Sequence, residues 1–161
     1  MAETENLDQT DVVSILRDSG YVMLTTALDD GKLLAHPMVP QQVTDEADVW
    51  FFIGMQGDQA TALLHNPEVN IAVSEAGNWL SVSGRIEFVD DQDKKDELWN
   101  DEVDAWFVGG RNDPGLGLMK VVGDSAQHWG LKGGKVSALA QIAKAKVTGD
   151  RSGGGSDTTE L

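Results

Sequence analysis

The length of the chain, 161 residues, favours a single domain, and a hydrophobic content of 40% is enough for a globular core. Its 27 acidic residues outnumber its 12 Lys and Arg, and the formal net charge of -15 disfavours a nucleic-acid or anionic-membrane partner. There is no Cys, which excludes disulfides and thiolate metal sites. The sequence starts without the basic and apolar segments of a signal peptide, and no apolar run approaches the roughly 18 residues of a membrane span. We therefore expect a cytoplasmic protein.

The first predicted element is a short amphipathic helix. Residues 1–6 are polar and acidic, and we expect them to be flexible. Residues 7–20 carry apolar side chains at helical spacing and end in a glycine, which predicts a helix over this range. Asp8 or Thr10 would cap its N-terminus.

A β-hairpin is predicted next. Residues 21–28 and 32–41 are rich in strand-forming residues, and the Asp-Asp-Gly sequence between them favours a tight turn. Pro37 and Pro40 each remove a backbone donor from the second strand. They indicate an edge strand, a bulge or a strand end.

Residues 49–66 predict a buried strand, a loop of small and polar residues, and a helix. Such a junction can hold a phosphate, because free backbone N–H groups and the helix dipole point toward it. However, residues 54–59 contain no Lys or Arg. Asp58 would cap the helix and would also repel an anion.

A second hairpin and the longest predicted helix follow. Residues 68–75 and 79–90 alternate as strands do, and Gly84 in the second strand indicates a bulge or the close approach of another group. Residues 91–107 predict one helix with its acidic side chains in solvent. Helical spacing turns three of its apolar residues inward, namely Trp99, Val103 and Trp106.

The last part of the chain predicts one or two strands over residues 117–130, a helical segment over 132–148 and a disordered tail over 149–161. In total, about six strands are joined mostly by hairpins, with one helix after the third strand and another after the fifth. This order favours a mainly β fold, namely a small antiparallel barrel with peripheral helices.

Residue types with catalytic or metal-binding potential do not form a recognisable motif. His36, His65 and His128 are not at metal-ligand spacing to one another or to acidic residues, so we predict no metal site. There is no G-x-S-x-G sequence and no Walker loop, and catalytic residues stay unassigned.

Aromatic residues are the other chemically notable group, with five Trp and four Phe. Core packing is the ordinary role of such residues, and we assign it to Trp50 and Trp99. For Trp79, Trp106 and Trp129 the choice between core packing and stacking on a flat cofactor stays open, and we include them among the candidate cofactor contacts.

The sequence resembles the general stress protein branch of the pyridoxamine 5'-phosphate oxidase-like flavoproteins, which have the FMN-binding split-barrel fold. Six segments carry the resemblance in order: YVMLTTALDDGKLLAHPM, DVWFFIG, HNPEVNIAVSE, WLSVSGRIEFVDD, LWNDEVDAWFVGGRNDPGLGLMKV and AQHWG. The resemblance runs from about Leu7 to Gly130, and it implies a six-stranded antiparallel split β-barrel as one flavin-binding-like domain over residues 7–131.

The family resemblance also implies a homodimer with FMN in a groove at the subunit interface. The flavin would lie along His36, Pro37 and Met38. Backbone groups around Phe52, Ile53 and Gly54 would contact it from the next strand. The arginine and lysine that usually hold the phosphate correspond here to His36 and Gln59, and Gly57 stands where a serine is common.

These departures remove two charge-assisted contacts with the phosphate. Each contact is worth about 1.5–3 kcal/mol, so their loss would weaken FMN binding by roughly a hundredfold or more. A partly protonated His36 could replace some of the charge. Four bases are candidates to reach the site: Lys32, Arg85, Arg111 and Lys120.

Three functions follow from the resemblance and its departures. The first is an FMN-binding, oxidoreductase-like protein whose substrate is unassigned. The second is a groove retuned to another cofactor, namely a deazaflavin, FAD or a tetrapyrrole, because His36 and Gln59 suit a less anionic ligand. The third is a cofactor-free stress or interaction protein that keeps the dimeric barrel.

Overall fold

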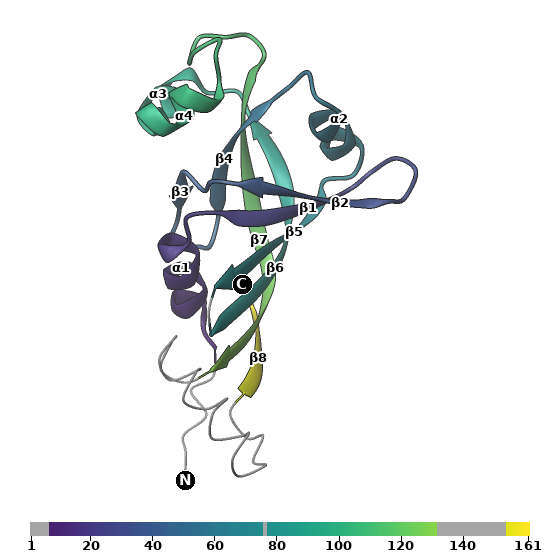
Figure 1. The fold of residues 1–161 in the computed structure, drawn as a ribbon, viewed down its shortest axis with the longest axis vertical. Coiled ribbons are helices and arrows are strands. Elements are labelled where there is room, and N and C mark those ends of the chain that lie inside the picture. Colours follow the sequence, from purple (N-terminus) through teal and green to yellow (C-terminus); the bar gives the residue numbers. More distant parts are fainter. Residues whose placement is uncertain (1–6, 76, 132–153) are drawn as a thin grey trace.

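The computed structural model describes residues 7–75, 77–131 and 154–161, and it consists of one antiparallel sheet with helices around it (Figure 1). The helices are α1 (Gln9–Asp18), α2 (Asp58–His65), α3 (Gln92–Leu98) and α4 (Asp101–Trp106). The strands are β1 (Val22–Ala27), β2 (Leu33–Met38), β3 (Gln42–Val43), β4 (Val49–Gly54), β5 (Glu68–Glu75), β6 (Asn78–Val89), β7 (Leu116–Leu131) and β8 (Gly154–Glu160).

The sheet curls around a single main core. Its strand order is β2-β1-β5-β6-β7-β4-β3, and β8 pairs with β7 beside this path. Leu24 of β1 and Phe51 of β4 are near opposite ends of this order, yet they share one buried cluster with Leu16 of α1. The predicted antiparallel split barrel with peripheral helices is therefore confirmed, as is one helix after the third predicted strand. The predicted number of six strands is wrong, because the described residues form eight, with β3 and β8 in addition to those predicted.

Gly84 marks a bulge between β6 and β7, as its position in the sequence predicted. Ser83 lies opposite Ser125, but Gly84 lies opposite Gly123, so β7 has one extra residue, Asp124. A Cβ atom on Gly84 would collide with the backbone carbonyl of Val122. Only glycine allows the two strands to approach this closely.

The long helix predicted over residues 91–107 is wrong, because the structure has two short helices there. Trp99 has extended backbone angles, and the Asn100 side chain accepts a hydrogen bond from the Val103 N–H at 3.0 Å to start α4. Asparagine is a strong N-cap, and this local bond competes with a continuous helix. Val103 faces the core as predicted, whereas Trp106 is 67% exposed and does not.

The disordered tail predicted over residues 149–161 is wrong for residues 154–161. Gly154–Glu160 form β8, which pairs antiparallel with β7 from Ser125 to Leu131. Composition did not indicate this strand, because its partner is the open edge of β7 rather than a pattern within its own sequence. The predicted helix over 132–148 and the flexible start over 1–6 lie outside the described residues.

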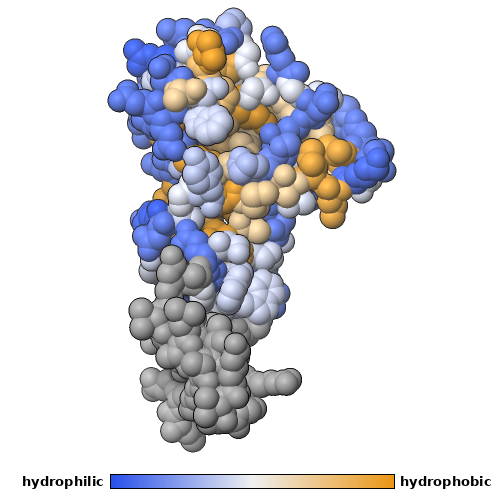
Figure 2. Space-filling view, in the orientation of Figure 1, coloured by the Kyte–Doolittle hydropathy of each residue, from blue (hydrophilic) through white to orange (hydrophobic). Residues whose placement is uncertain are grey.

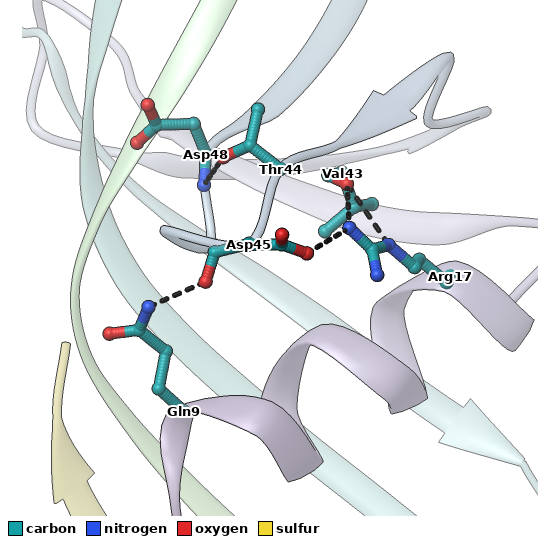
Figure 3. A network of polar contacts seen from close by, with 6 residues as sticks. All are labelled: Gln9, Arg17, Val43, Thr44, Asp45 and Asp48. Carbon is teal, nitrogen blue, oxygen red and sulfur yellow. Dashed lines mark hydrogen bonds and ion pairs between the residues drawn. The ribbon is translucent and has the colours of Figure 1, made fainter.

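Helix α1 is fixed to the turn between β3 and β4 by polar contacts (Figure 3). The Arg17 guanidinium donates to the Val43 carbonyl from Nε at 3.1 Å and from Nη2 at 2.8 Å, and Nη2 also contacts Asp45 at 2.8 Å. Gln9 donates to the Asp45 carbonyl at 2.6 Å. The N-cap is Asp8, one of the two predicted residues. These contacts hold α1 over the side of the main core that the curled sheet does not cover.

Asp48, in the same turn, is the one described group whose pKa departs clearly from its usual value. Burial raises the pKa of Asp48, Lys120 at 3.8 Å opposes this, and Glu46 and Glu87 add to it. The raised folded-state pKa means that the native state binds this proton more tightly than the unfolded state does. Ionised Asp48 therefore costs stability at neutral pH, and the cost disappears as pH falls toward the unfolded pKa of about 3.9.

We predict that Gly84→Ala destabilises the protein by about 1–3 kcal/mol, because the new methyl group forces β6 away from the Val122 carbonyl. Gly20→Ala is the matched control, since nothing lies within 4 Å of a Cβ there. Urea unfolding measures both. Equal stability of the two variants would contradict the close approach at the bulge.

We predict that Asp48→Asn raises stability slightly at pH 7, by under about 1 kcal/mol, and that this gain shrinks as pH falls to about 4. The amide keeps the shape of the side chain and removes the desolvated charge. Thermal unfolding across this pH range measures the effect. Asp18→Asn, at an exposed carboxylate, controls for the loss of one negative charge from an acidic chain. A stabilisation no larger than that of the control would refute the assignment.

Candidate cofactor site

The candidate site begins at β2, an edge strand that pairs only with β1 among the described strands. His36 lies opposite the buried Leu24, so its side chain is on the face that carries the core. Pro37 lies opposite Met23 on the outward face. The edge position agrees with the prolines, because an edge strand tolerates the loss of a backbone donor.

The ring of His36 carries an unsatisfied buried atom. Its Nε2 is buried and has no hydrogen-bond partner among the described residues. The same holds for Oγ1 of Thr26, a fully buried residue two positions along β1 from the partner of His36 and on the same face. A buried polar atom without a partner costs about 1–3 kcal/mol, and native structures rarely leave one without a reason. A bound polar ligand would supply that partner.

The end of β4 contributes its backbone rather than its side chains. Ile53 is 3% exposed and belongs to the main core, while Phe52 is 5% exposed and packs against Trp99 at 5.6 Å and Phe107 at 6.4 Å between ring centroids. These side chains are occupied. Beyond Trp50, however, β4 pairs with β7 on one side only within the described part of the chain. Backbone groups on the other side are therefore available to a ligand.

Helix α2 begins directly after this strand. Gly57 is its N-cap and provides no side-chain bond, so the expectation that Asp58 caps the helix is wrong. Asp58 is instead the first helical residue and is exposed, where its charge interacts only with the helix dipole. The backbone N–H groups of the first turn are left without a side-chain cap. They can donate to a ligand.

Gln59 connects α2 to β2. Its Nε2 lies 3.7 Å from Sδ of Met38, which packs against the main core together with Ile53. A Cβ on Gly57 would lie 3.7 Å from the Gly54 carbonyl. The structure thus brings the end of β2 next to the start of α2 through Met38 and Gln59, two of the residues that the resemblance assigned to the cofactor.

The four bases proposed from the sequence do not contact this site. Each has an acidic partner elsewhere: Lys32 with Asp30 at 3.4 Å, Arg85 with Glu68 at 2.9 Å, Arg111 with Asp96 at 3.9 Å and Lys120 with Glu87 at 3.4 Å. The candidate site therefore consists of neutral donors, the imidazole of His36 and the exposed carboxylate of Asp58.

The three candidate tryptophans lie away from this site within one chain. Trp79 and Trp129 are opposite each other on the outward face of β6 and β7, with 41% and 40% of their surface exposed. They lie at the end of the sheet where β8 pairs (Figure 1). Trp106 ends α4, on the opposite side of the molecule from α2 in the same view.

A hollow lies beside α1, away from His36 and Gln59. Its volume is about 380 Å³, and it is lined by Thr10, Val13, Ser14, Arg17, Asp18 and Asp45. Its single guanidinium is already bonded to Val43 and Asp45 (Figure 3). In the part of the chain that the structure describes, no group of three or more His, Cys, Asp or Glu is placed to hold a metal ion. No helix there is long and apolar enough to cross a membrane.

The sequence analysis missed Thr26 as a part of this site. The available signal was its alternation with Val22 and Leu24, which places a hydroxyl on the buried face of β1. The contact between Gln59 and Met38 had no such signal, because it joins two elements that are distant in sequence.

The sequence and the fold are both similar to those of known proteins. Residues 8–153 match the sequence profile described as "Pyridoxamine 5'-phosphate oxidase like". Protein bli-3 of Neurospora crassa is 26% identical over 157 residues, which cover 89% of this chain and 75% of that protein.

Two crystal structures are similar over most of the chain. One is described as a general stress protein 26 from Jannaschia sp. CCS1, with 29% identity, a TM-score of 0.73 and coverage of 92% of this chain and 95% of that chain. The other is the general stress FMN/FAD binding protein from Xanthomonas citri, with 32% identity, a TM-score of 0.65 and coverage of 76% and 87%. Both share the antiparallel fold described above.

Proposed function

This chain belongs to the pyridoxamine 5'-phosphate oxidase-like family, and on that basis we propose that it is a flavin-binding, oxidoreductase-like protein with FMN as the first candidate cofactor. The observation that carries the proposal is the buried Nε2 of His36, which has no described partner and lies on β2 two residues before Met38, the residue that contacts the start of α2. A flavin offers polar ring atoms that can satisfy this nitrogen, and a flat apolar ring system suited to the neighbouring core residues.

The residues present fit a flavin, with the weakest fit at its phosphate. His36 and Gln59 would hold it through neutral hydrogen bonds, and the free N–H groups at the start of α2 would face its anionic end. Backbone groups of Phe52, Ile53 and Gly54 would contact the ring. Bound FMN would supply the transfer of one or two electrons, while these residues would orient the ring and exclude water from it.

A second copy of the chain would complete the site. Strand β2 is exposed on both faces, with Leu33 at 73% and Leu34 at 43%. Figure 2 shows an apolar patch over the arm that β1 and β2 form. Tyr21, Met23, Pro37 and the Trp79–Trp129 pair extend exposed apolar surface over the outward face of the sheet. Exposed apolar surface of this extent favours an interface, and we propose a homodimer.

The retuned groove is the second candidate function. His36 and Gln59 stand where the family has an arginine and a lysine, Gln59 cannot neutralise a phosphate, and Asp58 beside it would repel one. A deazaflavin, FAD or a tetrapyrrole would then replace FMN at the same place. A cofactor-free stress or interaction protein is the outcome expected if no such ligand binds.

We predict that the protein binds FMN with a Kd tighter than about 100 μM and that Gln59→Lys tightens this binding about tenfold, since one charge-assisted contact is worth at least 1.5 kcal/mol. Quenching of flavin fluorescence during titration measures both values. Thr61→Lys is the matched control, because it adds the same charge to an exposed position on the same helix.

The ligand panel separates the three functions. If Gln59→Lys and Thr61→Lys act equally, the phosphate does not lie at the start of α2. Thermal stabilisation by a deazaflavin, FAD or a tetrapyrrole, with none by FMN, would favour the retuned groove. If none of these ligands binds or stabilises the protein, the result would favour the cofactor-free function.

We predict that the protein has twice the chain mass of 17.3 kDa in solution and that Leu33→Glu or Met23→Glu shifts it toward the monomer. A buried carboxylate at an apolar interface is costly, whereas both positions are exposed in the single chain. Light scattering after size exclusion measures the mass. Val108→Glu is the control, since Val108 is 99% exposed and lies off this face. A monomeric parent protein would contradict the interface.

A further inference from the structure

We propose that the hollow beside α1 binds a small α-amino acid. The carboxylates of Asp18 and Asp45 would receive its ammonium group, and the guanidinium of Arg17 would receive its carboxylate. The volume of the hollow, about 380 Å³, is in the range of small-molecule sites. The inference is independent of the flavin proposal, because α1 and α2 lie on different sides of the molecule (Figure 1).

Helix α1 provides five of the six residues that line the hollow. Thr10, Ser14 and Asp18 follow one another at helical spacing, and Val13 and Arg17 form the adjacent row, so all five face the same side of the helix. Val13 is 4% exposed and provides an apolar base. The other four side chains are exposed and form a polar rim. A ligand that combines charged groups with a short apolar part fits this surface.

The guanidinium of Arg17 is fixed in position and has one nitrogen to spare. Its Nε and Nη2 donate to the Val43 carbonyl at 3.1 and 2.8 Å, and Nη2 also contacts Asp45 at 2.8 Å. Figure 3 shows that the third nitrogen, Nη1, takes part in none of these bonds. Its N–H groups can donate to an acceptor in the hollow, and a carboxylate is the acceptor that a guanidinium binds most strongly.

The two carboxylates of the hollow favour a cationic group. Asp18 is exposed and has no hydrogen-bond or ion-pair partner among the described residues, and Asp45 uses one oxygen for Arg17. The lining therefore has one more negative than positive charge, within a chain of net charge -15. A simple anion is disfavoured here. An α-amino acid carries an ammonium group for the carboxylates and, one carbon away, a carboxylate for Nη1.

The turn opposite α1 is already ordered for such a ligand. Gln9 donates to the Asp45 carbonyl at 2.6 Å, and the Asp48 N–H donates to Oγ1 of Thr44 at 3.1 Å (Figure 3). These bonds fix the turn before any ligand arrives, so binding has little ordering cost there. The side chain of the amino acid would cover Val13, which favours an aliphatic one.

The test uses isothermal titration calorimetry of the full chain with L-leucine and two analogues that each lack one charged group. Isoamylamine is leucine without its carboxylate, and isocaproate is leucine without its ammonium group. We expect L-leucine to bind with a Kd below about 1 mM and each analogue to bind at least about tenfold more weakly, because each leaves one charged contact unmade. Equal binding of L-leucine and either analogue would overturn the proposal, as would no binding of L-leucine.

Variants place the binding in this hollow. Asp18→Asn should weaken L-leucine binding at least about fivefold, and Ser14→Phe should abolish it by filling the space. Asp93→Asn is the matched control, because it removes an exposed carboxylate from α3. Both positions in α1 are exposed, so thermal unfolding should show all three variants to be as stable as the parent. Equal effects of Asp18→Asn and Asp93→Asn, or unchanged binding by a folded Ser14→Phe, would contradict a site at α1.

Discussion

The pairing of β7 with three other strands is the constraint on which the rest of the structure depends. This one strand, residues Leu116–Leu131, joins β6 on one edge and both β4 and β8 on the other. It connects the two halves of the sheet, and the curl of the sheet then places Leu24 and Phe51 in the same core. Because side chains alternate between faces, a register shift by one residue would turn the core side of β7 to solvent. The bulge at Gly84 moves the register at one point and leaves the alternation intact on either side of it.

The same alternation defines the candidate site. It turns His36 and Met38 of β2 toward the core and Pro37 outward, so three consecutive residues serve two different surfaces. Of the inward pair, Met38 contacts Gln59 and His36 has a buried nitrogen without a described partner, while Pro37 joins the exposed apolar face. In the isolated chain, β2 therefore has a buried nitrogen without a described partner on one face and exposed apolar side chains on the other, and both lower the stability of the fold. A ligand on one face and a second copy on the other would remove both costs, which links cofactor binding to assembly.

Structural features that depend on a local residue pattern could be predicted from the sequence. Features that depend on contacts with distant parts of the chain could not. Alternation and turn residues predicted the main strands, and Gly84 predicted the bulge. The break at Asn100 was missed because apolar residues continue at helical spacing across it, while the Asn100 side chain caps the start of a second helix. Strand β8 was missed because its Gly-rich sequence forms a strand only against an edge already in place. At the site, the resemblance assigned roles to His36, Gly54 and Gln59. Strand alternation indicated that Thr26 is buried, but no pattern indicated that its hydroxyl would have no described partner.

The charges around the site determine what kind of ligand it can select. The bases considered from the sequence are held in ion pairs away from it, most of them exposed pairs that contribute little to stability. An anionic ligand would thus enter against the field of a chain with net charge -15, and among the described residues the site offers it neutral N–H donors and one imidazole. Neutral donors stabilise a bound anion less than a guanidinium does. They also disfavour an uncharged polar ligand less than a guanidinium does. Compared with a site built on arginine and lysine, the proposed flavin site would discriminate less by charge and more by the shape and hydrogen-bonding pattern of the ring, so the residues proposed to contact the ring would contribute most of its selectivity.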